Sequence, residues 1–272
     1  MDRIKRFLAF SGNVQVTVLE TRELVNRAIE IHSTTPSASK ILGGLLTCCA
    51  YFASGIKAES GAVSITVKAK DGDGAVSVSS DANLHVRGYA DGSCTQTLKG
   101  GSLTVVREDG YSQPFVGTCE IDSDDISDAF AKYFQQSEQI PTAVKVDIII
   151  DEDGKCKAAN GLIMQLLPDA DDEETDLAGE AFYNYCQEAN TTAYTADEIV
   201  QRFFSDKING EVVEVYPEYK CNCSQSKIKG VLASVGKAEL IKICEEQGQV
   251  RVHCHYCNTD YVFDKKDIED NF

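Results

Sequence analysis

Four cysteines near the C-terminal end of the sequence could bind a metal ion together. They form two local pairs, Cys221-Asn222-Cys223 and Cys254-His255-Tyr256-Cys257. Thiolate sulfur is a preferred ligand of Zn²⁺, and four such ligands complete its tetrahedral coordination without leaving a position for substrate. The sequence therefore predicts a structural zinc site with four thiolate ligands.

Two histidines flank Cys254, and either of them could replace a thiolate as a ligand. Because four cysteines at suitable spacing already fill the site, we favour the four-thiolate set and leave open whether His253 or His255 touches the metal. Three other cysteines lie in apolar helical patterns and are predicted to be small core residues: Cys48, Cys49 and Cys244.

The metal would supply most of the folding free energy of the segment around it. A structural zinc ion contributes roughly 10–16 kcal/mol of apparent binding free energy to a small module. If an oxidant converted the ligands to disulfides, the nearest partners in sequence would be Cys221 with Cys223 and Cys254 with Cys257. Loops this short recover only roughly 1.5–2 kcal/mol each through loop-closure entropy. Oxidation is therefore expected to release the metal and unfold the module.

Composition limits the partners and the compartment. A length of 272 residues suggests two folded units, and a net charge of -17 disfavours nucleic acids and anionic membranes. Eleven scattered cysteines are not a secreted disulfide framework. The charged N-terminal residues 1–10 show no signal peptide, and the apolar stretch 41–52 is too short to span a bilayer. We expect a cytoplasmic protein with neither nucleic-acid nor membrane partners.

Residues 1–175 are predicted to form an α+β domain with a mostly antiparallel sheet and packed helices. Helical spacing of apolar residues predicts helices over 21–32 and 40–56, and a third that is capped at 123–125 and runs to about 136. A turn at 71–74 is predicted to join a hairpin. Alternating apolar residues predict strands over 13–19, 62–69, 75–78, 84–89, 103–106, 143–150 and 161–167, the last two closing the domain.

Residues 176–219 are predicted to form an amphipathic, metastable linker. The acidic run 169–176 before it is predicted to be a solvated loop, because like charges repel each other. A helix is expected over 177–188, and a second begins at the capping-box pattern of Thr195 and Glu198. One face of this second helix is apolar, with Ile199, Val200, Phe203 and Phe204. The linker is too small to bury this stripe alone. If the stripe leans on the zinc module, loss of the metal would remove its cover and expose its apolar surface.

Residues 220–272 are predicted to form a small zinc-binding domain that acts as a redox switch. A helix begins near 236–239, and a hairpin places the second cysteine pair in the turn between strands at 250–252 and 261–263. From Lys220 to Phe272 there are eight Lys or Arg and eight Asp or Glu residues. Zinc modules that bind nucleic acid are basic, so this balance argues against that role.

Several motifs together resemble the heat-shock protein 33 family, the redox-regulated holdase chaperones of the bacterial cytosol and some organelles. The cysteine pairs, with Tyr261 and Phe263 after them, match the zinc module of that family. Three further segments are similar to family motifs. Val86-Arg87-Gly88-Tyr89 resembles VRGY, and residues 133–142 resemble two aromatic residues, two variable positions and then S-E-Q-x-P-T. Gly161, Gln165 and Pro168 resemble G-G-x-x-x-Q-x-x-P, with Asn160 in place of the first glycine.

The resemblance implies a protein that binds one Zn²⁺ and is inactive when reduced, and that is a stress-response chaperone rather than an enzyme. On oxidation, the disulfides Cys221–Cys223 and Cys254–Cys257 would form, zinc would leave and the linker would unfold. Homodimers would then bind unfolding client proteins without ATP and prevent their aggregation.

Two other functions are alternatives to the redox-regulated chaperone. A CxxC thiol-disulfide oxidoreductase usually places the motif at a helix N-terminus in a βαβ pattern, whereas here it follows a strand. A zinc-ribbon nucleic-acid adaptor is opposed by the charge balance. We recognise no arrangement of nucleophile, histidine and carboxylate in the sequence, and therefore predict no catalytic residues.

Overall fold

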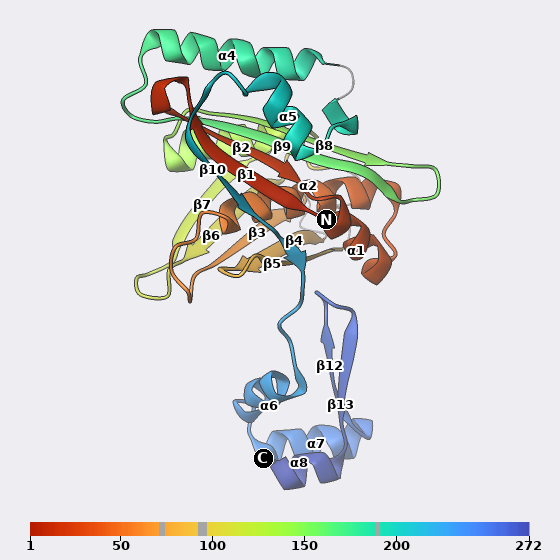
Figure 1. Cartoon of the computed structure of the whole chain (residues 1–272). Helices are drawn as coiled ribbons and strands as arrows, with labels where there is room; N and C mark the ends of the chain where they lie inside the picture. Colours follow the sequence, from red (N-terminus) through yellow and green to blue (C-terminus); the bar gives the residue numbers. More distant parts are fainter. Residues whose placement is uncertain (71–73, 92–96, 189–190, 272) are drawn as a thin grey trace. The chain divides into compact units, whose positions relative to one another are not determined.

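Three sheets organise the structure, a computed structural model that describes residues 1–70, 74–91, 97–188 and 191–271. The chain divides into two units, Met1–Lys220 (unit 1) and Cys221–Phe272 (unit 2), each of which is described by itself (Figure 1). The turn predicted at 71–74 lies largely outside the described residues. The strands that it was expected to join do pair as antiparallel neighbours.

Unit 1 contains two sheets whose described neighbouring strands are antiparallel, except for one short parallel pair. Sheet A has the order β10-β1-β2-β9-β8, with β1 (Arg3–Ala9), β2 (Val14–Glu20), β8 (Thr142–Ile150), β9 (Cys156–Leu166) and β10 (Ile208–Val215). Sheet B has the order β11-β5-β4-β3-β6-β7, with β3 (Ala62–Lys68), β4 (Ala75–Asp81), β5 (His85–Ala90), β6 (Ser102–Glu108), β7 (Phe115–Glu120) and β11 (Glu218–Tyr219). The predicted α+β class is confirmed.

Helices fill the space between the two sheets. They are α1 (Arg22–His32), α2 (Pro36–Ala53) and α3 (Ile126–Tyr133), which continues into a π-helical turn, η3 (Phe134–Glu138). Helix α2 contacts both sheets, which explains why nearly its whole length is buried. It begins four residues earlier than predicted, because Thr35 caps it and Pro36 suits the first helical position.

A second layer of helices covers the other face of sheet A (Figure 1). It consists of α4 (Asp172–Gln187) and α5 (Ala196–Phe203), with a short 3-10 turn, η4 (Thr191–Ala193), before α5. The prediction of a solvated loop over 169–176 was wrong. Asp171 and Glu174 form a capping box, and residues 172–176 open the helix. Carboxylates in a first turn are stabilised by the helix dipole, which offsets their mutual repulsion.

Sheet A also extends beyond its predicted boundaries. Strand β1 was not predicted, and β9 begins five residues before the predicted start. The expectation that 161–167 would be the last strand of the domain was wrong, because β10 pairs with β1 and β11 pairs with β5. Strand β10 is mostly exposed, so it has no clear apolar alternation from which it could be predicted. Residues 176–219 therefore lie within unit 1, and part of them belongs to its sheets.

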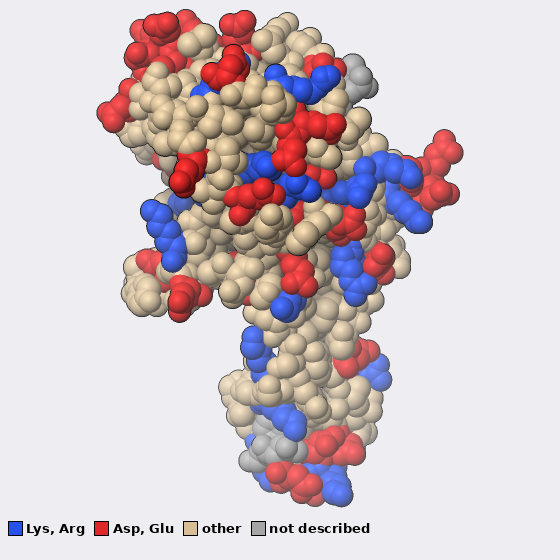
Figure 2. Space-filling model, in the orientation of Figure 1, with Lys and Arg blue, Asp and Glu red and all other residues tan. Residues whose placement is uncertain are grey.

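Unit 2 is small and contains α6 (Gln225–Ala233), α7 (Lys237–Gln247), β12 (Val250–Cys254), β13 (Thr259–Phe263) and α8 (Lys265–Asn271). The helix predicted after 236 and the hairpin that carries the second cysteine pair are both confirmed. Its core consists of Leu232, Leu240, Cys244, Val250, Phe263 and Ile268. Figure 2 shows acidic side chains gathered over the end of α4, where the first turn is acidic, whereas unit 2 presents both signs of charge. No described helix is both long and apolar enough to cross a membrane.

Candidate metal centre

The structure brings the four cysteines of unit 2 together. One sulfur atom from each of Cys221, Cys223, Cys254 and Cys257 lies within 4.8 Å of the others. The Sγ atoms of Cys221 and Cys254 are 3.7 Å apart, and those of Cys223 and Cys257 are 3.2 Å apart. Zn–S bonds of about 2.3 Å in a tetrahedron separate the sulfur atoms by about 3.8 Å. The four sulfur atoms are therefore positioned to bind one metal ion, and their softness suits Zn²⁺.

Three local structures position these ligands. Cys221 and Cys223 lie in the extended segment before α6, whose first turn is capped by the hydroxyl of Ser224. Cys254 ends β12, and Cys257 lies in the turn that leads to β13. A CxxC in the turn of a hairpin differs from the helix N-terminus that a thiol-disulfide oxidoreductase uses.

Neither flanking histidine belongs to the metal-competent group found among the described residues. The Nδ1 atom of His253 instead lies 2.8 Å from a carboxylate oxygen of Asp260. The ring of His255 meets the ring of His253 edge-on, with centroids 5.1 Å apart. The donor set that the structure presents is thus four thiols.

Four thiols at this distance cannot all lose their protons without a cation, because the thiolates would repel each other. Burial, with hydrogen bonds among the thiols, raises the pKa of Cys221 and of Cys257. Burial also acts to raise the pKa of Cys223, but hydrogen bonds from Tyr261 and the neighbouring thiols bring it down to about 7. The Tyr261 hydroxyl lies 3.0 Å from that sulfur. A divalent cation would complete the deprotonation, so binding should release protons.

The predicted apolar stripe of the linker is covered by sheet A. Ile199 and Phe204 are 0% exposed, and Val200 and Phe203 are partly buried. The ring of Phe204 meets that of Phe7 edge-on at 5.7 Å. The suggestion that the stripe leans on the zinc module is therefore corrected: the residues that cover it belong to unit 1. The stripe packs against side chains from β1, β2 and β9: Phe7, Val16, Val18, Leu162 and Met164.

These covering residues were not singled out from the sequence. Strand β2 was predicted, but its alternation suggested only one buried face, whereas the strand is buried on both sides. A run of consecutive apolar residues, Val16 to Leu19 with one threonine, was the available signal for a strand covered on both faces.

Polar contacts also hold the linker to unit 1. The predicted capping box of Thr195 and Glu198 is present. Asp197 forms ion pairs with Arg3, at 2.6 Å, and with Lys5. The side-chain amide of Asn160 donates to the carbonyls of Thr191 and Tyr194, at 3.0 Å each. Asn160, which departs from the family motif, therefore joins β9 to the segment immediately before α5.

The chain enters unit 2 from β11, whose Tyr219 is fixed to sheet B. Its hydroxyl donates to the carbonyl of Gly88 at 2.8 Å and lies 3.2 Å from Nε2 of His32. Gly88 is the glycine of the VRGY motif, and a Cβ there would lie 2.6 Å from Val78. The glycine of this motif therefore allows close packing against Val78, at the position where the Tyr219 hydroxyl bonds to the backbone.

The cysteines predicted to be core residues are buried: Cys48, Cys49 and Cys244. Burial raises the pKa of both Cys48 and Cys49, and the proximity of the two thiols raises that of Cys48 further. These thiols are therefore poor nucleophiles, since the thiolate is the reactive form.

Comparisons with known proteins agree with this architecture. The family model described as Hsp33 protein matches residues 2–264. The 33 kDa chaperonin of Clostridium botulinum (strain Langeland) is 30% identical over 286 residues, covering 99% of this chain and 96% of the relative. That of Clostridium novyi (strain NT) is 32% identical over 290 residues, covering 98% and 96%.

A solved structure shares the fold as well. The crystal structure of the 33 kDa chaperonin (heat shock protein 33 homolog) from Thermotoga maritima superposes with a TM-score of 0.85 at 26% identity, covering 99% of this chain and 97% of that one. With the family model matching nearly the whole length, the chain belongs to the Hsp33 family, whose members are chaperones and not enzymes.

Proposed function

We propose that this chaperone is a redox-controlled holdase that acts without ATP. The observation that carries the proposal is the cluster of four sulfur atoms within 4.8 Å of one another, in a unit whose own core is small. A second observation supports it: an amphipathic helix in the other unit hides an apolar face that could bind clients.

In the reduced protein, Cys221, Cys223, Cys254 and Cys257 would hold one Zn²⁺, which completes the folding of unit 2 when bound. Since the six buried core residues offer little apolar burial, the free energy of folding of unit 2 would depend on these ligands. In this state α5 stays docked on sheet A and the chaperone is inactive.

Oxidation would remove the ligands. When a disulfide forms, its two cysteines give up two electrons and two protons. Hydrogen peroxide accepts them and is reduced to two molecules of water. We propose the pairs Cys221–Cys223 and Cys254–Cys257, which are local in sequence. Sulfur atoms from different pairs also approach each other in the folded module, so the disulfide pairing must be measured directly.

Unfolding of unit 2 would reach the linker through the chain, from Cys221 back to Tyr219 and β10. We propose that β11 and β10 then leave their sheets and α5 lifts off, which defines residues 176–219 as a metastable linker between residues 1–175 and 220–272. Release would expose two apolar surfaces at once: the stripe of Ile199, Val200, Phe203 and Phe204, and the face of sheet A beneath it.

The partners would be unfolding client proteins, and the oxidised form would be a homodimer. The net charge of -17 supports a protein that binds neither nucleic acids nor anionic membranes. We place the protein in the cytoplasm, because its scattered cysteines do not form a secreted disulfide framework.

A client-aggregation assay tests this function. Reduced, zinc-loaded protein should fail to suppress the aggregation of a chemically unfolded client, whereas protein treated with peroxide and heat should suppress it. Zinc release, disulfide mapping by mass spectrometry and binding of a hydrophobic dye are followed in parallel. Equal suppression by the reduced protein, or zinc release without added dye binding, would refute the switch.

A further inference from the structure

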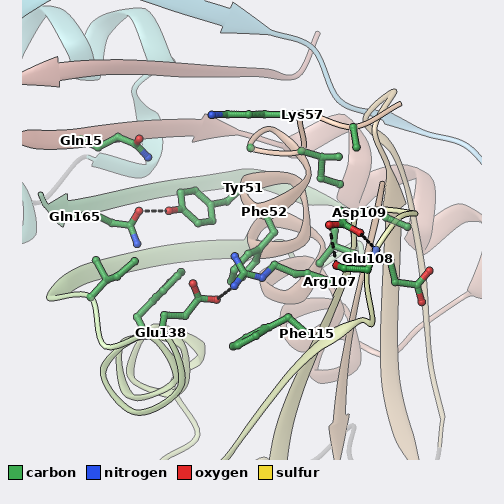
Figure 3. Close-up of a pocket in the computed structure, with 18 of the residues that line it drawn as sticks. Gln15, Tyr51, Phe52, Lys57, Arg107, Glu108, Asp109, Phe115, Glu138 and Gln165 are labelled. Atoms are coloured by element: carbon green, nitrogen blue, oxygen red, sulfur yellow. Dashed lines mark hydrogen bonds and ion pairs between the residues drawn. The ribbon is translucent and has the colours of Figure 1, made fainter. Parts of the chain in front are cut away.

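A cavity of about 600 Å³ lies in unit 1, at a place that the redox switch does not use. Figure 3 shows side chains from both sheets and from the end of α2 around it. Its volume is in the range of cavities that bind small organic molecules. None of its lining residues belongs to α4, α5 or unit 2, so it is formed while the linker is docked.

Two motifs of the sequence converge on this cavity, although neither takes part in the switch. Phe134 and Glu138 come from the segment 133–142, and Gln165 comes from the strand motif that begins at Gly161. Glu138 and Gln165 are labelled in Figure 3. The Tyr51 hydroxyl donates to Oε1 of Gln165 at 2.6 Å, and the amide of Gln165 donates to Thr142 at 3.1 Å. These bonds fix the orientation of the wall.

Aromatic side chains form an apolar surface in the cavity. The rings of Phe52 and Phe134 are stacked, with centroids 5.4 Å apart and an interplanar angle of 18°. Tyr51 meets Phe134 edge-on at 5.8 Å, and Phe115, at the opening, is 43% exposed. Such a surface suits the ring or the short alkyl chain of a ligand.

Two of the three cations that line the cavity, Arg6 and Lys57, form no ion pair within the described residues. Arg107 is paired with Glu138 at 2.9 Å, and Glu138 also accepts from the Tyr133 hydroxyl. Arg6, by contrast, donates only to uncharged acceptors in the described part of the chain: the carbonyls of Ser54 and Tyr51 and the hydroxyl of Ser54.

Arg6 therefore caps α2 and keeps its full charge beside the cavity. Burial lowers its pKa, and the group that opposes this shift is the Tyr51 hydroxyl rather than a carboxylate. Its Nε–H has no acceptor among the described residues, and two of its five N–H groups are unused. A Cβ at Gly55 would lie 3.5 Å from Nη1, so the glycine leaves the guanidinium uncovered.

The other charged groups at the opening do not neutralise Arg6. Lys57 is exposed and forms no ion pair within the described residues. The carboxylate of Asp109 accepts hydrogen bonds from the backbone N–H groups of Tyr111 and Ser112, in the same turn. Glu108 is exposed and adds one negative charge at the rim. Three cations and three carboxylates line the cavity, so its net charge is zero: Arg6, Lys57, Arg107, Glu108, Asp109 and Glu138. An anion would therefore be attracted by the local charge of Arg6 and not by the net charge of the cavity, and a second negative charge would be repelled by the flanking carboxylates.

We propose that this cavity binds a small organic monoanion, a carboxylate carried on an aromatic or short aliphatic body, in the reduced protein. The carboxylate would accept from Arg6, with Lys57 contributing from the opening, and the body would lie against Phe52 and the more exposed ring of Phe115. This binding does not require oxidation. It is expected only while β10 stays paired with β1, because Arg6 lies opposite Val213 in that pairing.

Calorimetry on the reduced, zinc-loaded full chain tests the proposal with 4-phenylbutyrate as the probe. The matched control ligand is 4-phenyl-1-butanol, which has the same body without the charge. We expect saturable binding at one site per chain, with the carboxylate at least about tenfold tighter, because charge-assisted hydrogen bonds are the strong ones. Equal affinity for the two ligands, or no binding of either, would overturn the proposal.

Variants locate the site. Arg6→Gln keeps a donor for the cap of α2 but removes the charge, and should weaken binding of the carboxylate at least about tenfold. Arg27→Gln makes the same chemical change in an exposed ion pair outside the cavity and should leave the affinity unchanged. Ala58→Trp should fill the cavity and abolish binding; circular dichroism and zinc content establish that each variant folds.

Two outcomes would contradict the assignment. If the affinity for 4-phenylbutyrate is unchanged in both Arg6→Gln and Ala58→Trp, the probe binds elsewhere. If a blocked Ala-Phe-Ala peptide displaces the probe and binds more tightly, the cavity serves polypeptide and not a small anion. If Arg6→Gln does not fold, the site is tested with Ala58→Trp and Lys57→Gln, which should also weaken binding of 4-phenylbutyrate. The redox switch is tested by activating the protein with oxidant, whereas ligand binding is tested on the reduced protein. Either proposal can therefore be refuted without the other.

Discussion

Different forces stabilise the fold of unit 1 and the fold of unit 2. Unit 1 buries two large clusters of apolar side chains, one between its sheets and one under α4 and α5. Unit 2 buries six such residues and gathers four thiols within reach of a single ion. Apolar burial is insensitive to oxidants, whereas thiolate ligation is lost when sulfur is oxidised. The contrast shows that one chain can combine a unit stabilised by apolar burial with a small unit whose thiols are positioned to hold a metal ion.

The largest effect should come from removing the thiolate ligands. Replacing Cys221, Cys223, Cys254 and Cys257 with serine should unfold unit 2, because roughly 10–16 kcal/mol of metal-dependent folding free energy is lost. Hydrogen exchange should show rapid exchange of α7 and of the β12–β13 hairpin, while β2 and β9 stay protected.

The matched control is Cys186→Ser, which changes one exposed thiol of α4. It should leave both units protected and the zinc content unchanged. If the fourfold variant keeps unit 2 protected, the apolar core of that unit is sufficient and the contrast between the two units is wrong.

The next effect concerns the apolar cover of the linker. Phe204→Ala should weaken the docking of α5 by about 3–5 kcal/mol, because this fully buried ring packs against Phe7. The reduced variant should bind more hydrophobic dye and exchange the amides of α5 faster, with its zinc content unchanged. Val213→Ala, on the exposed face of β10, should do neither. Unchanged dye binding and unchanged amide exchange in Phe204→Ala would show that this ring does not hold α5 to sheet A.

A smaller effect is expected from Asn160. Asn160→Ala removes two hydrogen bonds to buried backbone carbonyls before α5, and should cost about 2 kcal/mol of docking free energy. The oxidant dose that activates the chaperone should fall accordingly. Asn83→Ala, in the exposed turn between β4 and β5, is the matched control and should leave the dose unchanged. An unchanged dose for Asn160→Ala would mean that these bonds do not limit linker release.

Local patterns in the sequence were enough to find the ligands and the caps. Cys221 and Cys257 are recognisable from spacing, and the capping box at Thr195 depends on residues three positions apart. The partner of the apolar stripe could not be found this way, because Phe204 meets Phe7 across nearly two hundred residues of chain. Strand β10 was missed for a related reason: its pairing with β1, and not an apolar pattern of its own, makes it a strand.

The cavity in unit 1 shows the same limit. Glu138 and Gln165 were visible as parts of motifs, but their types suggest no chemistry until the fold places them around one space. The charge of Arg6 became informative only when its acceptors were known to be uncharged. A binding site formed by residues that are far apart in the sequence can therefore be inferred only from the structure.

The smallest predicted effect is a dependence of linker docking on pH. The hydrogen bond from Lys5 is the main cause that lowers the pKa of Asp197 below its ordinary 3.8. A carboxyl group with a lowered pKa stabilises the fold above the unfolded value, and this contribution is lost as the pH falls through the folded value. Because Asp197 is 55% exposed, solvent screening limits the contribution to less than about 1 kcal/mol. Asp197→Asn should speed hydrogen exchange of α5 slightly at pH 7, and the difference from the original protein should vanish only when the pH falls below the folded pKa of Asp197, which is lower than 3.8. Asp153→Asn, in an exposed turn, should show no difference at either pH. A difference for Asp197→Asn that persists in acid would mean that the carboxylate charge is not what holds α5 to β1.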